Sequence, residues 1–407
     1  MQAANHSYLS YCTNIHPGEQ WAQVMHSLTA HALPVKQLMQ AEPFGLGLRL
    51  SAIAAAQLAQ PDNLARFKDW LQANGMYVFT MNGFPYGQFH NTTIKDQVHA
   101  PDWTTPERLA YTKQLFDLLK HFLPEGEKQA GISTSPLSYK YWRTSPQAIE
   151  VVFNKATENM VQLVNHLVTI KNTEGYVLHV AIEPEPDGLI ETSAELIHWY
   201  NNYLLKKGIP LLCQLSGCTP ARAEAHLRAH VTLCYDVCHF AVGFESQAQV
   251  MHNMQREGIA IGKVQISAAL KARLTDGNRQ EVAQALAPFN EPSYLHQAVI
   301  QQADGSLDRY RDLPQALAAL PTTKGTELRT HFHVPLFIEQ YGLLASTQAD
   351  VIEVLHLCCE QQHTRQLEVE TYTWGLLPET LQLPINQSIA RELQWVQQTL
   401  AQYKPKA

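Results

Sequence analysis

The chain has 407 residues, 45% of them hydrophobic and 16% charged, so it is long and apolar enough to bury a large core. Thirty basic against 37 acidic residues give a net charge of −7, the wrong sign for a surface that neutralises nucleic-acid phosphates, so we expect no nucleic-acid partner. The N-terminal residues carry no secretion signal, and no apolar run reaches the length of a membrane span, which predicts a cytoplasmic protein.

Short β-rich runs alternate with longer helical patterns along the whole chain, which is typical of βα units. The runs predicted as strands are Tyr8 to Asn14, Leu46 to Ser51, Met76 to Asn82, Ala130 to Ser135, Leu178 to Pro184, Val231 to Val237, Ile261 to Ser267 and Gln366 to Tyr372. The helical stretches include Glu107 to Phe122, Pro146 to Lys171, Ser193 to Lys207 and Thr347 to Gln361. The alternation predicts an α/β fold, a single (β/α)8 TIM barrel over residues 1–407.

Two segments are longer than ordinary connections. Phe84 to Asp102 form an aromatic loop after the third run, and residues 268–340 are inserted between the seventh and eighth runs. The insertion contains one β-like piece, Leu328 to Phe337. Loops of this length beside a barrel mouth commonly cap it, so we expect a lid or pocket wall at the C-terminal face. Decoration of a remote surface is the alternative.

Nearly every predicted strand ends in a group that can bind or react. Because parallel barrel strands all end on one face, these side chains are expected to meet at a common mouth. They are Asn14, Ser51, Asn82, Ser135, Glu183, Asp236, Gln265 and Glu370.

Glu183 lies in HVAIEPEP, where prolines stop the strand, so its carboxylate is expected at the rim. Glu185, two residues on, is predicted to lie at the surface. Asp236 is followed by His239, and such a pair can bind a cation, although an aspartate after a strand also commonly caps the next helix.

Two further patterns point to a cation. His331 and His333 alternate with Phe332 in THFHVP, so an extended chain would place both imidazoles on one side. A half-buried strand with hydrogen-bonded histidines is the alternative. Glu368 and Glu370 share one face of LEVETYTW, and a carboxylate pointing into the barrel needs a cation or a hydrogen-bond partner.

The order Glu183, Asp236 with His239, then Glu370 resembles the xylose-isomerase-like TIM-barrel superfamily of sugar isomerases, epimerases and abasic-site endonucleases. The resemblance implies that Glu183 and Glu370 are metal ligands and the acid/base pair, that Asp236 is a ligand and that His239 contacts substrate. Gln265 stands where the epimerases have a histidine ligand, so His331 or His333 is expected to supply the missing nitrogen, or a harder cation binds weakly, or metal binding has been lost.

A closer resemblance is to the EboE-type metabolite-traffic proteins. It rests on YCTNIHPGE (Tyr11 to Glu19), NGFPYGQFH (Asn82 to His90), YDVCHFAV (Tyr235 to Val242) and HFHVP (His331 to Pro335). It implies a small-molecule metabolite as ligand and a membrane-associated partner encoded in the same gene cluster. The substrate contacts expected from these motifs and the strand ends are Asn14, His16, Asn82, His239 and Gln265.

Three hypotheses follow. The first is a sugar isomerase or epimerase in which Mn²⁺, Zn²⁺ or Mg²⁺ is held by Glu183, Asp236, Glu370 and one of His331 and His333. The second is a non-catalytic binder or carrier that uses the same mouth to assist export. The third, an endonuclease-like repair enzyme, is disfavoured by the acidic charge.

Overall fold

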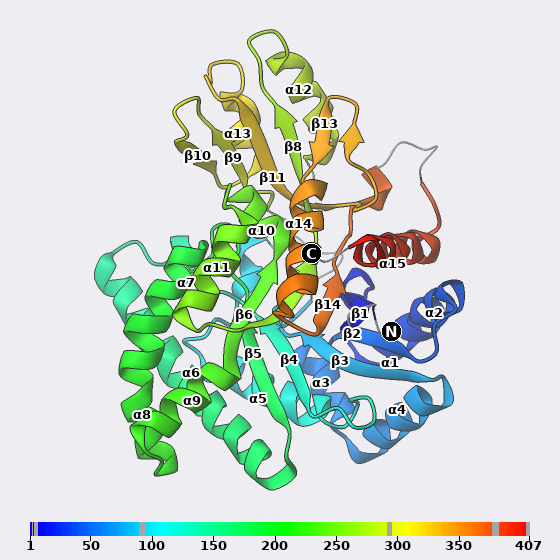
Figure 1. The fold of residues 1–407 in the computed structure, drawn as a ribbon, viewed down its shortest axis with the longest axis vertical. Helices are drawn as coiled ribbons and strands as arrows, with labels where there is room; N and C mark the ends of the chain where they lie inside the picture. Colours follow the sequence, from blue (N-terminus) through cyan, green and yellow to red (C-terminus); the bar gives the residue numbers. More distant parts are fainter. Residues whose placement is uncertain (2, 4–6, 89–94, 291–294, 377–381, 404–407) are drawn as a thin grey trace.

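The computed structural model describes residues 1–407 except residues 2, 4–6, 89–94, 291–294, 377–381 and 404–407. Eight parallel strands form a barrel in the lower half of the molecule (Figure 1), in the order β1-β14-β7-β6-β5-β4-β3-β2. They are β1 (Tyr8–Tyr11), β2 (Phe44–Arg49), β3 (Met76–Asn82), β4 (Gln129–Thr134), β5 (Val177–Ile182), β6 (Val231–Asp236), β7 (Ile261–Ile266) and β14 (Gln366–Val369). The predicted TIM barrel is confirmed.

The barrel closes between β1 and β2 through side chains as well as backbone. Cys12 and Gly47 form a single parallel bridge there. The Ser10 hydroxyl donates to Gly45 O at 2.7 Å and accepts from Gly47 N at 3.2 Å. One hydroxyl therefore satisfies two backbone groups that the incomplete ladder leaves open.

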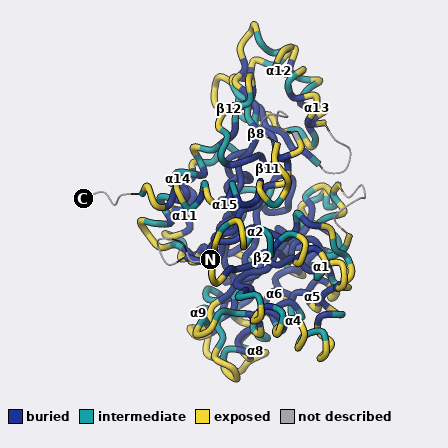
Figure 2. Tube along the Cα trace, turned by 90° about the vertical axis from the view of Figure 1, so that its right-hand side faces the viewer, coloured by how far each residue is buried: buried dark blue, intermediate teal, exposed yellow. Residues whose placement is uncertain are grey.

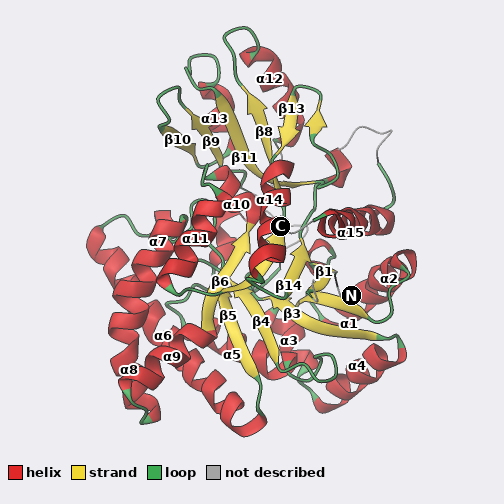
Figure 3. Cartoon of the chain, in the orientation of Figure 1, coloured by secondary structure: helices red, strands yellow, loops and turns green. Residues whose placement is uncertain are grey.

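Helices surround the barrel (Figure 3), and many begin at a serine or threonine. Thr105, Ser145, Thr192, Thr219 and Ser246 each accept a hydrogen bond from the backbone N–H three residues on, a cap that contributes about 1 kcal/mol. The helices are α1 (Trp21–Ser27), α2 (Leu33–Met39), α3 (Ala52–Leu58), α4 (Pro61–Ala73), α5 (Pro106–Leu119), α6 (Pro146–Glu174), α7 (Ser193–Trp199), α8 (Lys206–Ser216), α9 (Pro220–His230), α10 (Val237–Val242), α11 (Gln247–Glu257), α14 (Gln348–Gln361) and α15 (Ile385–Gln402).

The insertion after β7 folds as a second sheet that rises from the barrel at the top of Figure 1. Its strands are antiparallel, in the order β10-β9-β11-β8-β13-β12, with two helices beside them. Sequence analysis found only the β11 region, because β9, β10, β12 and β13 have four residues or fewer and little pattern of their own, and β8 follows β7 after one residue without a break in the apolar run. The elements are β8 (Ala268–Arg273), α12 (Arg279–Leu286), β9 (Ala298–Gln301), β10 (Leu307–Tyr310), α13 (Leu313–Ala319), β11 (Glu327–Val334), β12 (Gln340–Tyr341) and β13 (Leu344–Ser346).

The pairing of β8 with β11 brings two histidines back to the barrel. β7 continues through Ser267 into β8, and β11 runs antiparallel to β8, so its last residues return to the point where β8 leaves the barrel. The register shifts between Thr330 and Val334. Such an irregularity re-aims side chains, and here it spans His331 and His333.

The buried residues extend through the barrel and along the second sheet (Figure 2). Inside the barrel, Lys263 Nζ lies 2.5 Å from Glu368 Oε2, and both side chains are fully buried. Gly47 leaves the room they need, since a Cβ there would lie 1.5 Å from Glu368 Oε1. The partner that an inward Glu368 requires is therefore a lysine. Among the described residues, no helix is long and apolar enough to cross a membrane.

Candidate metal and ligand site

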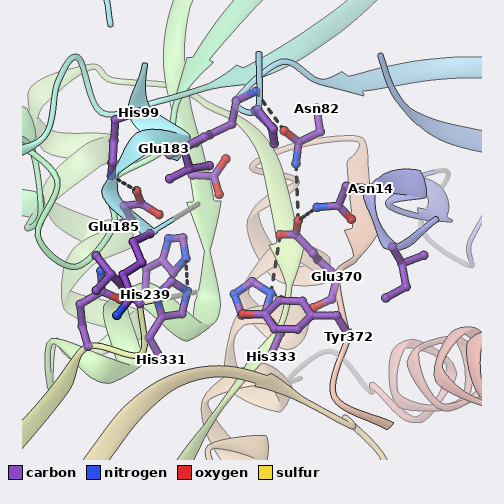
Figure 4. Close-up of a pocket in the computed structure, with 17 residues that line it drawn as sticks. Asn14, Asn82, His99, Glu183, Glu185, His239, His331, His333, Glu370 and Tyr372 are labelled. Carbon is purple, nitrogen blue, oxygen red and sulfur yellow. Dashed lines mark hydrogen bonds and ion pairs between the residues drawn. The ribbon is translucent and has the colours of Figure 1, made fainter. Parts of the chain in front are cut away.

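A cavity of about 270 Å³ lies at the C-terminal ends of the barrel strands (Figure 4). An engineered cavity of about 150 Å³ accommodates benzene, so this one can hold a small metabolite. Its wall comes from the strand ends, from the 84–102 loop and from the 268–340 insertion. Residues 89–94 of the loop and residues 291–294 of the insertion lie outside the described residues. The lining residues are Asn14, Ile15, Asn82, Phe84, Pro85, Lys95, Val98, His99, Glu183, Glu185, His239, Leu295, Gln297, His331, His333, Glu370 and Tyr372.

Three carboxylates lie close together at the ends of β5, β6 and β14: Glu183 and Glu370 line the cavity, and Asp236 lies behind its wall. Oxygen atoms of Glu183, Asp236 and Glu370 lie within 4.8 Å of one another, and all three residues are buried. Within the described part of the chain, Glu183 Oε2 and Asp236 Oδ2 have no hydrogen-bond partner. Buried oxygens of this kind are costly unless something pairs with them, so the donor set fits a divalent cation.

The electrostatic environment of Glu183 shows the same need for a cation. Burial, followed by the charges of Glu370, Asp236 and Glu185, raises the pKa of Glu183 well above its usual value, and Lys263 opposes the shift. Lys263 cannot neutralise the group, because it is paired with Glu368. A divalent ion would favour the ionised carboxylates through its own charge.

Asp236 serves as a helix cap and as a possible ligand at once. Its Oδ1 accepts from His239 N at 3.2 Å, which caps α10, and from the Ser267 hydroxyl at 2.7 Å. These bonds fix the carboxylate and leave Oδ2 without a hydrogen bond from any described residue. The two interpretations of Asp236 from the sequence are therefore compatible.

Amide side chains hold Glu370. Its Oε1 accepts from Asn14 and, at 3.4 Å, from Asn82, and its Oε2 accepts from Gln265. The expectation that Gln265 contacts substrate needs correction, because Gln265 is fully buried and absent from the cavity lining. It lies behind Glu370, where the Cys234 thiol also donates to its Oε1 at 2.8 Å.

His16 lies elsewhere, against the expectation that it contacts substrate. β1 ends at Tyr11, and the 3-10 turn Thr13–Ile15 puts Asn14 and Ile15 in the cavity wall while the chain leaves it at His16. His16 Nε2 lies 3.0 Å from the Tyr11 hydroxyl, and its ring stacks on His31 with centroids 4.2 Å apart. The turn decides this, and a strand-end pattern cannot show it.

Three histidines form one side of the cavity. His239 lies on α10, three residues after Asp236, and His331 and His333 lie on β11. His239 and His333 each place Nε2 3.8 Å from Asp236 Oδ2. His333 is thus the β11 histidine nearer the carboxylates, and the Tyr372 ring stacks over it at 4.9 Å.

The cavity wall also holds a contact between a carboxylate and a histidine that the sequence did not reveal. Glu185 Oε1 lies 2.9 Å from His99 Nε2, and the two side chains are 12% and 2% exposed. The surface position expected for Glu185 is wrong, because the 84–102 loop covers it. His99 was inside a segment predicted to border the mouth, but no local pattern marks it as the partner of Glu185.

Comparisons with known proteins support the fold. No protein-family model matches the sequence, and no curated protein matches it. A xylose isomerase-like TIM-barrel protein from Mycobacterium smegmatis, solved with magnesium, is similar with a TM-score of 0.50 and 12% identity over 98% of each chain. A xylose isomerase domain protein from Alicyclobacillus acidocaldarius subsp. acidocaldarius has a TM-score of 0.45 and 9% identity, with 97% of this chain and 98% of that chain covered. The first likeness shows the TIM-barrel fold.

Proposed function

We propose that this protein is a divalent-metal-dependent enzyme that isomerises or epimerises a small polyhydroxylated metabolite. The observation that carries the proposal is the convergence of Glu183, Asp236 and Glu370 at the cavity wall, with two buried carboxylate oxygens that accept no hydrogen bond from the described residues. The similarity to a barrel solved with magnesium is consistent with it.

The three carboxylates would hold the ion. When bound, the ion polarises a carbonyl or hydroxyl oxygen of the substrate. Glu183 is the stronger candidate for proton transfer at the neighbouring carbon, because its Oε2 accepts no hydrogen bond from the described residues. Asn14 and Asn82 would position substrate and Glu370 together.

One observation favours a non-catalytic binder or carrier instead. Both oxygens of Glu370 already accept hydrogen bonds from amide groups. A carboxylate held in this way is a good ligand but a poorer proton acceptor, and a reaction with two acid/base groups needs both to be available. The EboE-like motifs and a membrane-associated partner belong to this second candidate.

The test combines metal content with hydrogen exchange at carbon. Protein purified without chelators is expected to contain stoichiometric metal, and with Mn²⁺ and ketose or aldose substrates in D₂O it should place deuterium next to the carbonyl. Glu183→Gln should abolish the exchange and remove the rise in Tm that Mn²⁺ produces. That rise reflects a stabilisation of about 2.7 kcal/mol when the metal is a hundredfold above its Kd.

Glu392→Gln is the matched control, because Glu392 is a buried carboxylate outside the cavity. It should keep both the metal and the exchange. Bound metal without exchange on any sugar tested would favour the carrier. A wild-type protein with no metal and no melting shift with any divalent ion would contradict the enzyme proposal.

A further inference from the structure

The three histidines of the cavity wall, His239, His331 and His333, lie close to one another. Their ring centroids are 4.7 Å apart for His239 and His331, 5.4 Å for His331 and His333, and 5.6 Å for His239 and His333. His239 and His333 are 4% and 3% exposed. Figure 4 shows the rings of His239 and His331 in contact, with His333 below Glu370.

Each of the three rings has its Nδ1 fixed by an oxygen acceptor. Nδ1 of His239 lies 2.8 Å from Pro184 O, Nδ1 of His331 lies 2.9 Å from Gln297 Oε1, and Nδ1 of His333 lies 2.9 Å from Glu370 O. Exchanging the oxygen and nitrogen of the Gln297 amide would lose a hydrogen bond, because its Nε2 donates to Pro186 O at 3.2 Å. Nδ1 therefore carries the proton in each neutral ring, and every Nε2 keeps a lone pair.

Nε2 of His239 faces Nε2 of His331, and the Nε2 atoms of His239 and His333 each approach Asp236 Oδ2. His239 Nε2 and His331 Nε2 are 3.1 Å apart, and two lone pairs at that distance repel unless a proton or a cation lies between the rings. His333 Nε2 has no hydrogen-bond partner in the described chain, and neither has the nearby Asp236 Oδ2. Two nitrogens bound to one tetrahedral zinc ion at 2.0–2.1 Å are separated by about 3.3 Å, close to the observed spacing.

We propose that His239, His331, His333 and Asp236 bind a second divalent cation, of the Zn²⁺ or Co²⁺ type, beside the site of the three carboxylates. Asp236 Oδ2 belongs to both ligand sets, so the cavity holds a nitrogen-rich and an oxygen-rich site side by side. Imidazole ligands suit Zn²⁺ and Co²⁺, whereas carboxylates suit Mg²⁺ and Mn²⁺. This second site does not depend on the proposed reaction.

The orientation of each ring supports a ligand role over a packing role. In metal sites, a histidine that binds through one nitrogen donates its other N–H to a carbonyl or carboxylate, which fixes the tautomer and the ring. All three histidines show this arrangement, although they come from two elements about 90 residues apart in sequence, α10 and β11.

Cys238 is the other candidate ligand near β11, since its Sγ lies within 4.8 Å of ligand atoms of His331 and His333. Its thiol, however, donates to Phe332 O at 3.6 Å. Asp236 therefore completes the set in preference to Cys238, and Cys238→Ser is a matched control.

The test is a Co²⁺ titration of the chelator-treated full chain, with bound metal counted by elemental analysis and coordination followed by absorption. Wild type and Cys238→Ser are expected to bind two Co²⁺ per chain, one of them giving the intense visible band of four-coordinate Co²⁺. His331→Gln and His239→Gln should each lose the band and one equivalent. Far-UV circular dichroism checks that each variant is folded.

Glu183→Gln separates this proposal from the proposed function. It should keep the band and lose the other equivalent. If wild type binds a single Co²⁺ with the band and Glu183→Gln does the same, the carboxylate site fails and the histidine site stands. If no Co²⁺ gives the band, or if wild type binds a single Co²⁺ that both Glu183→Gln and His331→Gln lose, the second site is overturned.

Discussion

Glu368 and Glu370 lie two residues apart on the same chain segment but differ in surroundings. Glu368 is paired with Lys263 inside the barrel, whereas Glu370 lines the cavity. Burial is the largest single effect and would lower the pKa of Lys263, but Glu368 together with Cys234 and Cys12 raises it. The Lys263 and Glu368 side chains are fully buried. Lys263 is therefore not available to the cavity carboxylates. Lys140 pairs with Glu191, and Arg143 lies 3.9 Å from Asp102, so these two basic residues have other partners as well. The cavity carboxylates are thus left without a basic partner of this kind.

We expect Lys263→Met to destabilise the protein by about 3–5 kcal/mol, because it leaves the Glu368 charge buried without a partner. Replacing both residues, as Lys263→Met with Glu368→Leu, should recover much of that loss. Urea unfolding measures both. The exposed Lys155 pairs with Glu158 at 2.9 Å, and Lys155→Met should cost at most about 1 kcal/mol. A double variant no more stable than Lys263→Met would contradict this account.

At the scale of elements, Gly47 of β2 is explained by a side chain of a strand on the other side of the barrel closure, β14. Its six residues, FGLGLR, are all buried, although two are glycines, which strands disfavour. Gly47 faces Glu368 of β14 and bridges to Cys12 after β1, so the missing side chain makes room for the inward carboxylate and for closure of the barrel.

Gly47→Ala is therefore expected to cost about 1–3 kcal/mol through overpacking, because its Cβ would lie 1.5 Å from Glu368 Oε1. Gly87→Ala is the matched control, since a Cβ there meets nothing within 4 Å, and its unfolding free energy should stay close to that of wild type. Equal stability of the two variants in guanidinium unfolding would show that Glu368 can move aside.

At the scale of the whole molecule, Glu392 on α15 joins the C-terminal helix to the segment after β11. Its Oε2 accepts from Leu336 N at 2.8 Å and its Oε1 accepts from Trp374 Nε1 at 3.1 Å. Burial raises the pKa of Glu392 to about 8, although these two hydrogen bonds and Arg391 oppose the shift. The folded protein therefore holds this proton at pH values where the unfolded chain has released it.

This linkage predicts that the contribution of Glu392 to the free energy of unfolding falls as pH rises from about 4.5 to about 8. In this range the unfolded chain binds fewer protons at Glu392 than the folded protein does. At one pKa unit per 1.36 kcal/mol, the loss by pH 8 is at most about 5 kcal/mol. Glu392→Gln removes the titration, so its stability relative to wild type should increase between pH 5 and pH 8 in urea unfolding. A difference that stays constant with pH would contradict the raised pKa.

The sequence alone determined the barrel and the place of its carboxylates, because βα alternation fixes parallel strands and parallel strands end on one face. Glu183, Asp236 and Glu370 could be brought together on that ground, since each is the last residue of its strand or the first one after it. The tertiary structure alone decided which side chains pair. The turn after β1 removes His16 from the cavity, the loop before α5 covers Glu185 with His99, and Lys263 takes Glu368 rather than the cavity carboxylates. The histidine group depends on the irregular register of β11 against β8, which is set by pairing across some 60 residues and leaves no local pattern in the sequence.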